Sequence, residues 1–557
     1  MSTVTPRLLV GPLLRYVDES RATIWVETDR PCTVEVLGVR EPTWTVHRHH
    51  YALLVLEGLA PGGETPYEVR LDGERAWPLP RSPFPPSVIR TFRTDETFRL
   101  AFGSCRRVAP FDRRGLRRYG ADALVALARR MRDLPYEQWP DALFLAGDQV
   151  YADMPSAKLH RRLKVLHKGI DDGLGTEIRD FEEYTWLYHE SWNTPAVRWL
   201  LSTVPSCMLL DDHDLRDDWN TSAAWRQYVT AQPWWRDRVV GGFGSYWVYQ
   251  HLGNLSPEQL ADDETYRMVR TVTDDDERTR LLDDFAWRAD AEPESTRWSF
   301  YRDFGNGRLG IRMVAVDSRC SRRFDSHRVM VDDDEWKWVT EHALVPREGE
   351  RIDHLLIGST LPYLLPPGIH HVESWNEAVA EGAWGPRVGH VAELVRQKVD
   401  LEHWAAFRQS FDQMADLLVR VAAVPDPPAS ALLLSGDVHC SYTAEARVPG
   451  VDPERIAVHQ LTMSPFRNPL NVPLKLANRI AGTERMARLT ARLAGTARVP
   501  PAGVDWRMRY GPWFDNGVMT VVLNGRDASF EVAHAHVVGG RQVLRPTYRR
   551  RLTRRRS

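Results

Sequence analysis

Four short clusters of potential metal ligands occur in the sequence, and each directly follows a run of apolar residues. The apolar runs cover residues 100–102, 142–146, 206–210 and 431–434. The clusters after them are Gly103-Ser104-Cys105, Gly147-Asp148-Gln149-Val150-Tyr151, Asp211-Asp212-His213-Asp214 and Ser435-Gly436-Asp437-Val438-His439. Functional groups of open α/β sheets gather at the carboxyl ends of the strands. If the four strands are neighbours in the sheet, the clusters meet and predict a metal site.

Each cluster also has a simpler explanation. A single Gly-Asp pair after a strand is usually a turn, and a lone cysteine such as Cys105 is usually a small buried apolar residue. The cluster 211–214 is harder to explain, because three adjacent carboxylates and an imidazole repel one another unless cations or hydrogen bonds compensate them. Asp437 and His439 fall on the same side of an extended segment. The four clusters together favour metal binding.

From residue 98 onward, short apolar runs alternate with helical patterns. This alternation predicts a layered α/β architecture, whose strands and helices must position these residues. A long helix is predicted near 391–422, where apolar residues recur at three- and four-residue steps. The Trp- and Asp-rich stretches 156–205 and 221–297 are predicted to be insertions that wall or cover the site.

The chain is predicted to have three parts. Residues 1–95 contain short β-branched and aromatic runs separated by Gly/Pro turns and read as a small all-β sandwich, in which residues 56–71 resemble a corner of fibronectin type III-like domains. Residues 96–540 form the catalytic domain with helical insertions. Residues 541–557 carry a block of arginines and are predicted to be a disordered basic tail.

Composition narrows the functional classes. A formal net charge of -2 gives no reason to expect a nucleic-acid partner, and five widely spread cysteines do not predict a disulfide framework. No secretory signal or membrane span is recognisable, so we expect a cytoplasmic protein. Residues 474–498 hold six basic residues and one glutamate, and could form an amphipathic helix on an anionic membrane surface or polymer. Such a helix more often packs its apolar face on the protein.

The order and context of the four clusters resemble the PhoD-type alkaline phosphatases, a branch of the calcineurin-like metallophosphoesterases. The segment Asp317-Ser318-Arg319 and the stretch 334–339 that follows it are also similar to this family. The resemblance covers nearly the whole chain. It implies an α/β fold in which a four-layer αββα sandwich follows a small N-terminal β-sandwich of the fibronectin type III or immunoglobulin kind.

The resemblance also implies a dinuclear metal site. Asp148 would bridge the two metals, and a first site suited to Fe(III) would be completed by Cys105, Tyr151 and His439. Asp212 and Asp437 would hold a second, harder cation, for which Ca²⁺ is expected because it prefers oxygen ligands. Mn, Zn or Mg are the other candidates.

The catalytic roles are likewise implied by the resemblance. A metal-bound hydroxide would attack phosphorus in line, and His213, oriented by Asp214, would protonate the departing alkoxide. Arg106 or Arg319 could bind the remaining phosphate oxygens. A structural ion pair is an equally open role for either arginine.

The predicted function is therefore hydrolysis of phosphate monoesters, diesters or both by a metal-dependent phosphoesterase. One alternative is a phosphodiesterase dedicated to lipid or anionic-polymer diesters, which would suit the basic segments. A second is a non-catalytic binding protein with a degenerate metal site. Redox chemistry at an iron site is a third, which the carboxylate-rich second site does not favour. The sequence does not decide between monoester and diester substrates, nor does it predict the oligomeric state.

Overall fold

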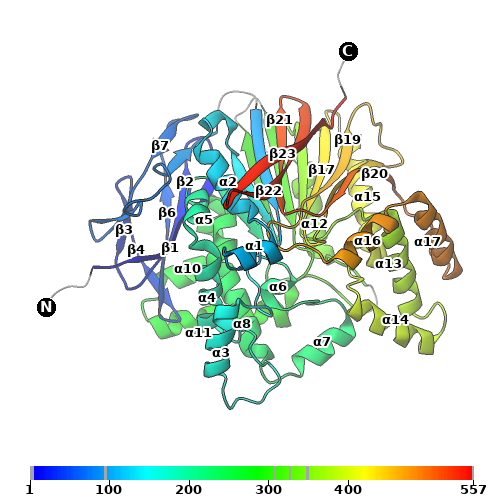
Figure 1. Cartoon of the computed structure of the whole chain (residues 1–557), viewed down its shortest axis with the longest axis horizontal. Coiled ribbons are helices and arrows are strands. Elements are labelled where there is room, and N and C mark those ends of the chain that lie inside the picture. The colour runs from blue at the N-terminus through cyan, green and yellow to red at the C-terminus, as the bar shows by residue number, and fades with distance from the viewer. Residues whose placement is uncertain (1–4, 93–96, 306–308, 325–327, 346–350, 555–557) are drawn as a thin grey trace.

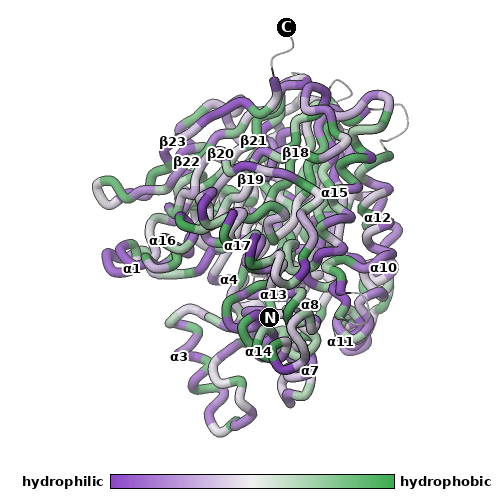
Figure 2. Tube along the Cα trace, turned by 90° about the vertical axis from the view of Figure 1, so that its right-hand side faces the viewer, coloured by the Kyte–Doolittle hydropathy of each residue, from purple (hydrophilic) through white to green (hydrophobic). Residues whose placement is uncertain are grey.

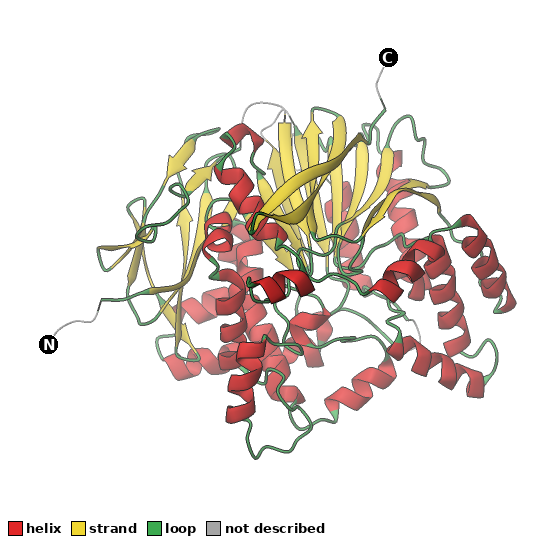
Figure 3. Ribbon diagram, viewed as in Figure 1, coloured by secondary structure: helices red, strands yellow, loops and turns green. Residues whose placement is uncertain are grey.

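The computed structural model of the chain describes residues 5–92, 97–305, 309–324, 328–345 and 351–554. A small β-sandwich at the N-terminus packs against a larger domain whose strands are flanked by helices (Figure 1). The ribbon coloured by secondary structure shows the strands gathered centrally and the helices below and beside them (Figure 3). None of the described helices is long and apolar enough to cross a bilayer.

The N-terminal domain consists of two four-stranded sheets and one strand pair. The first sheet has the order β1 (Leu8–Val17), β2 (Ala22–Thr28), β6 (His49–Leu56) and β5 (Trp44–Val46). The second has the order β4 (Val39–Pro42), β3 (Thr33–Val36), β8 (Val69–Leu71) and β9 (Glu74–Trp77), and β10 (Val88–Arg90) pairs with β7 (Glu64–Pro66). Alternate residues such as Ile24, Val34 and Leu54 meet in one core between the sheets. The predicted all-β domain is thus confirmed, although its predicted boundary at residue 95 lies outside the described residues.

The larger domain contains a six-stranded and a seven-stranded sheet. The six-stranded sheet has the order β13 (Ser206–Leu209), β12 (Ala142–Ala146), β11 (Thr97–Gly103), β21 (Gly517–Asn524), β22 (Asp527–Val538) and β23 (Arg541–Arg551). The seven-stranded sheet has the order β14 (Phe300–Gly305), β15 (Gly310–Val316), β16 (His354–Ser359), β17 (Ser430–Ser435), β19 (Ala457–Thr462), β18 (Ser441–Arg447) and β20 (Asp505–Trp513). The strands β11, β12 and β13 run parallel, as do β15, β16, β17 and β19.

The two sheets pack face to face and helices cover their outer faces. Phe102 and Phe144 of the first sheet share an apolar cluster with Met313, Leu356 and Leu432 of the second. Residues one position along, such as Leu143 and Leu433, point to the opposite faces and join helical clusters. The helices are α2 (Ala123–Arg132) and α5 (Pro195–Leu201) on one side, and α12 (Asp333–Leu344) and α15 (Arg408–Ala423) on the other. The predicted four-layer αββα sandwich is confirmed.

The remaining helices extend this scaffold. They are α1 (Arg113–Tyr119), α3 (Ala157–Leu166), α4 (Phe181–Trp192), α6 (Asp212–Leu215), α7 (Ala223–Thr230), α8 (Trp235–Tyr246), α9 (Pro257–Asp262), α10 (Glu264–Thr271), α11 (Asp275–Ala291), α13 (Pro367–Ala380), α14 (Pro386–Lys398), α16 (Val472–Ala481) and α17 (Glu484–Thr496). The Trp-rich stretches predicted to be covering insertions are largely core-forming, because Trp192, Trp199 and Trp235 are buried in the cluster under the first sheet.

Two sequence predictions are corrected by the structure. The basic C-terminal segment is not a disordered tail, because residues 541–551 form β23 and pair antiparallel with β22 along its length, burying Gln542 and Leu544 on alternate positions. Residues 555–557 lie outside the described part. The single helix predicted near 391–422 is two helices, α14 and α15. Asp400, which has a φ of 52°, lies in the break between them.

The sandwich is fixed to the larger domain by buried polar contacts. Arg15 of β1 is fully buried and donates hydrogen bonds to the carbonyl oxygens of Ser206 and Tyr249 at 3.0 and 2.8 Å. Asn254 accepts from the backbone N–H of Met208 and donates to its carbonyl oxygen, while Arg302 of β14 donates to the carbonyl oxygens of Gly253 and Asn254. Arg302 also donates to the carbonyl oxygen of Arg15 at 3.2 Å. The contacts of Arg15 therefore join the two domains, whereas those of Asn254 and the other hydrogen bonds of Arg302 lie within the larger domain.

Candidate metal centre

The four predicted clusters meet, but they come from two sheets. The strands β11, β12 and β13 are neighbours in the six-stranded sheet, whereas β17 belongs to the facing sheet. The expectation that all four strands are neighbours in one sheet is therefore wrong for the last cluster. The clusters converge because the carboxyl ends of the parallel strands in both sheets open toward the same edge of the sandwich.

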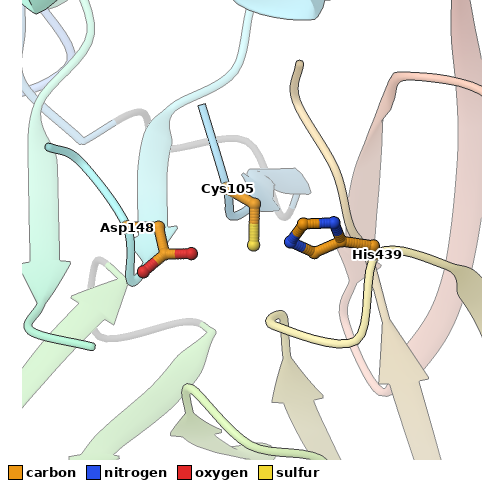
Figure 4. A group of neighbouring side chains, drawn as sticks. All are labelled: Cys105, Asp148 and His439. Carbon is orange, nitrogen blue, oxygen red and sulfur yellow. The ribbon is translucent and has the colours of Figure 1, made fainter. Parts of the chain in front are cut away.

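Three predicted ligands lie within ligand distance of one another. A sulfur of Cys105, a carboxylate oxygen of Asp148 and a ring nitrogen of His439 all lie within 4.8 Å of each other. Figure 4 shows the three side chains pointing toward a common space. The Tyr151 hydroxyl donates to Asp148 Oδ2 at 3.1 Å, which adds a phenol to the group. A thiol, a phenol, an imidazole and a carboxylate suit a transition metal.

Asn468 is a further residue at this position that the sequence did not reveal. Its side-chain amide donates to the Tyr151 hydroxyl at 3.2 Å and lies 3.4 Å from His439 Nε2. It follows Arg467, whose backbone pairs with Arg106 in an isolated bridge. No acidic, histidine or cysteine pattern surrounds Asn468 in the sequence, so it carried no signal there.

The backbone at the site is held in a conformation that L-residues rarely adopt. Cys105, Asp148, Asp437 and His439 have φ values of 56°, 53°, 60° and 49°. Each such residue costs about 1 kcal/mol, and this kind of strain is concentrated at functional sites. Gly147, with a φ of 94°, allows the turn, and a Cβ placed there would lie 2.6 Å from the Cβ of Asp211.

The electrostatics of the first site favour a cation. Asp148 is fully buried, and its Oδ1 has no hydrogen-bond partner among the described residues. Burial raises the pKa of Asp148 well above its usual value; His213 opposes this rise, and Asp211 and Asp212 add to it. Burial also raises the pKa of the Cys105 thiol, with a further contribution from Asp148. A bound metal ion would reverse both shifts, because it stabilises the thiolate and the carboxylate. The residues present therefore fit a metal.

The second predicted site is rich in carboxylates. Oxygens of Asp148, Asp211 and Asp212 lie within 4.8 Å of one another. Asp211 is already engaged, because its Oδ1 accepts from Arg319 Nε at 2.5 Å and from the Thr360 hydroxyl at 3.1 Å. Both oxygens of Asp212 accept backbone hydrogen bonds, from the N–H groups of His213 and Asp218 at 3.0 Å each, whereas Asp211 Oδ2 has no hydrogen-bond partner among the described residues.

Arg319 lies among these carboxylates. It is fully buried, and its Nη1 donates to Glu402 at 2.5 Å. Its Nη2 is 3.4 Å from Asp212 Oδ1 and 3.9 Å from Asp437 Oδ1. The guanidinium therefore balances the charge of the acidic side chains and orients them.

Arg106 also forms a structural ion pair. Its Nε and Nη2 lie 3.0 and 2.8 Å from Asp122 Oδ2, and its Nη1 donates to the Ser191 carbonyl oxygen. Asp122 caps the N-terminus of α2, so Arg106 links the turn after β11 to that helix. The partners of its guanidinium belong to the scaffold and not to the predicted metal ligands.

His213 has a different orienting partner from the one predicted. Its Nδ1 lies 2.9 Å from Asp153 Oδ2, and its Nε2 lies 3.5 Å from Asp217 Oδ1. Asp214 instead accepts hydrogen bonds from the backbone N–H groups of Asp211 and Val150, at 2.9 and 3.1 Å, and so fixes the first turn of α6. The sequence contained a signal for this role, because Asp153 is a carboxylate that lies only two residues after Tyr151, the last residue of the second cluster.

A cavity of about 370 Å³ lies over the second site. Its polar end includes Asp212, His213, Asp437 and His439, and its apolar wall includes Leu365, Ile369, Leu401, Leu470 and Leu474. The break between α14 and α15 adds His403 to the polar end. His403 Nδ1 lies 2.7 Å from Glu373, and its Nε2 lies 3.5 Å from Asp437 Oδ2 without a hydrogen bond. Neither residue was predicted. His403 depends on where the long helix breaks, and Glu373 lies inside α13 and contacts the site through His403.

Comparisons with known proteins agree with this architecture. A family model described as a domain of unknown function (DUF7800) matches residues 5–89, the N-terminal sandwich. No curated protein matches the chain in sequence. A solved structure described as "Structure of PhoD" superposes with a TM-score of 0.55 and 10% sequence identity, covering 99% of this chain and 93% of that one. The two proteins share a fold. The match to PhoD includes both the sandwich and the αββα domain, because it extends over nearly the whole chain.

Proposed function

We propose that the protein is a metal-dependent phosphoesterase that hydrolyses phosphate monoesters, diesters or both at a dinuclear centre. The observation that carries this proposal is the convergence of Cys105, Asp148 and His439 beside the carboxylates of Asp212 and Asp437, at the polar end of a cavity. The PhoD-like fold supports the same conclusion.

The residues divide between two cations. Cys105, Tyr151 and His439 would hold Fe(III), Asp212 and Asp437 would hold Ca²⁺, and Asp148 would bridge them. Mn, Zn or Mg are alternatives that the same ligands accept. Two bound cations would neutralise phosphate oxygens and activate water as a nucleophile.

The chain's own side chains supply orientation and a proton. His213 lines the cavity, and its pKa is raised well above the usual value because Asp153 and Asp148 outweigh the effect of burial. A protonated imidazole at this position can donate to the oxygen of the departing alkoxide. Arg319 donates hydrogen bonds to Asp211 and Glu402 and lies 3.4 Å from Asp212, so its charge would hold these carboxylates in place beside the cavity.

Metal analysis combined with hydrolysis assays tests this function. Elemental analysis of freshly purified protein should find two metal ions per chain, and chromogenic mono- and diesters should be hydrolysed. Asp148→Asn and Cys105→Ser should lose metal and activity together, whereas Cys32→Ser in the N-terminal sandwich should lose neither. A protein that binds no metal and stays inactive on both esters after addition of iron, calcium, manganese or zinc would contradict the proposal.

A further inference from the structure

The helix α16 leaves its apolar face uncovered. Val472, Leu476 and Ile480 are 77%, 57% and 43% exposed, and no residue of α16 is buried. They are four residues apart and therefore lie along one side of the helix. The sequence favoured packing of this face on the protein. Only α17 does this in part, burying Thr490 and Ala494 next to α13.

The same region carries a strong positive charge. In α16 and α17 the basic residues are Lys475, Arg479, Arg485, Arg488 and Arg492, opposed by Glu484. Polar and apolar residues alternate along both helices in the hydropathy colouring of Figure 2. Lys475 and Arg479 lie over the ring of Phe514 at 5.9 and 5.3 Å and flank the apolar side. An apolar face bordered by cations is typical of helices that lie in a lipid interface.

This surface is continuous with the cavity over the candidate metal centre. Leu474, 48% exposed, and Asn478 of α16 line the cavity, and so does Val399 after α14, which is 54% exposed. Leu470 and Ile369 extend the apolar lining inward toward Asp437. The exposed lining of the cavity therefore combines apolar side chains with the carboxylates of Asp217 and Asp400, and its apolar part borders directly on the uncovered helix.

We propose that α16 docks this protein on an anionic lipid bilayer, with Val472, Leu476 and Ile480 entering the interface and the cavity mouth facing the lipid. The cations of α16 and α17 attract anionic headgroups, and the apolar side chains add burial once the helix reaches the surface. The docking depends on the outer face of the helix and not on the proposed hydrolysis.

Vesicle co-sedimentation with the full-length protein tests the docking. The vesicles consist of phosphatidylcholine alone, or of phosphatidylcholine with about one third phosphatidylglycerol. The variant Val472→Ser/Leu476→Ser/Ile480→Ser should lose about ten-fold or more in affinity for the anionic vesicles. Lys475→Gln/Arg479→Gln should reduce the preference for anionic over neutral vesicles, and added salt should do the same in the wild type.

Matched controls come from α3, which exposes similar residues far from α16 in sequence. Val165 and Leu166 are 74% and 52% exposed, and Arg161 and Lys164 are exposed on the same helix. Val165→Ser/Leu166→Ser and Arg161→Gln/Lys164→Gln should bind vesicles like the wild type. Circular dichroism checks that every variant is folded.

Three results would overturn the proposal. The wild type could fail to bind anionic vesicles, or the α3 variants could lose as much affinity as the α16 variants. The protein could also self-associate through α16 without binding vesicles, which sedimentation equilibrium would detect. Asp148→Asn should dock like the wild type. Docking with no hydrolysis in the wild type would contradict the proposed function alone, and hydrolysis with no docking would contradict this inference alone.

Discussion

His213 is oriented by a carboxylate from a neighbouring loop, and this arrangement separates two aspartates that look equivalent in sequence. Asp153 contacts the imidazole, whereas Asp214 holds the backbone of residues 150 and 211. Losing a carboxylate that orients a metal-bound histidine typically costs about 10–100-fold in activity, and we expect a similar cost for the carboxylate that orients His213 beside the metal site. Substitution of Asp153 should therefore affect mainly activity, and substitution of Asp214 should affect mainly folding stability.

We expect Asp153→Asn to lower kcat by about 10–100-fold with little change in folding stability. Asp214→Asn should weaken two buried hydrogen bonds and lower the free energy of unfolding by about 1–3 kcal/mol. Steady-state kinetics and urea unfolding of both variants measure this difference. If Asp214→Asn kept normal stability but lost most of its kcat, Asp214 and not Asp153 would be the residue that orients His213.

His403 lies beside the proposed second metal site. Its Nε2 faces Asp437 without a hydrogen bond, while Glu373 holds its other nitrogen. This carboxylate–histidine arrangement is common beside metals, and its loss typically weakens metal affinity by about 10–100-fold. His403→Gln should therefore lower the occupancy of the second metal in equilibrium dialysis. His371→Gln, on the same helix as Glu373, should leave both metals bound; an equal loss in the two variants would argue against the role of His403.

At the scale of the elements, the loops after the strands depend on glycines that permit close approach. Gly147 has a φ of 94°, and a Cβ there would meet Asp211 at 2.6 Å. Gly169 has a similar φ of 89°, but a Cβ there would meet nothing within 4 Å. Substituting alanine for Gly147 and for Gly169 therefore separates the cost of the backbone conformation from the cost of the steric clash with Asp211.

Gly169→Ala should lower the free energy of unfolding by about 1 kcal/mol, the cost of a left-handed conformation. Gly147→Ala should lower it by about 2–4 kcal/mol and should also reduce metal binding, because Asp211 must move. Urea titrations and metal analysis measure both effects. Equal destabilisation by the two substitutions, with metal binding intact, would show that the contact with Asp211 is unimportant.

The sequence predicted the strands and the clusters after them because burial on both faces leaves continuous apolar runs and ligands have recognisable side chains. It did not predict that β17 belongs to a second sheet, since pairing depends on contacts distant in sequence. Asn468, Glu373 and His403 were missed because their partners at the site lie 29 or more residues away in sequence, whereas Asp153 lies close to the second cluster and was overlooked. The arginines of β23 predicted a solvated tail. In the structure, backbone hydrogen bonds to the neighbouring strand β22 outweigh the repulsion between these arginines.

At the scale of the whole molecule, a buried carboxylate joins the two domains. Glu27 of β2 is fully buried and lies 2.9 Å from His189 of α4 and 3.0 Å from His49 of β6. His49 also lies 2.8 Å from Glu182 of α4. Burial opposes protonation of His49, but its hydrogen bonds to Glu182 and Glu27 outweigh this and raise its pKa to about 9. The charge of one histidine therefore affects the domain contact.

The stability that the domain interface contributes should depend on pH. The folded pKa of His49 is raised, so its contribution is complete below the ordinary value of 6.5 and is lost as pH rises through about 9. The pKa of Glu27 is lowered, so its contribution is lost as pH falls below about 4.5. We expect the free energy of unfolding to fall by about 2 kcal/mol between pH 6.5 and pH 9.5. Urea midpoints measure this, and His49→Gln should flatten the profile; a wild-type midpoint constant over this range would exclude the linkage.

The contact of Arg15, Asn254 and Arg302 with the first strands of both sheets has a consequence for solubility. The strands β13 and β14 are the outermost strands at one end of their sheets, and such edges can recruit strands from other molecules. Asn254 occupies the backbone groups of Met208, and Arg15 caps the carbonyl oxygen of Ser206. The N-terminal sandwich supplies one of these two contacts. A chain lacking residues 5–89 should therefore expose the carbonyl oxygen of Ser206 and aggregate more readily, whereas Asn254 should still occupy the backbone groups of Met208.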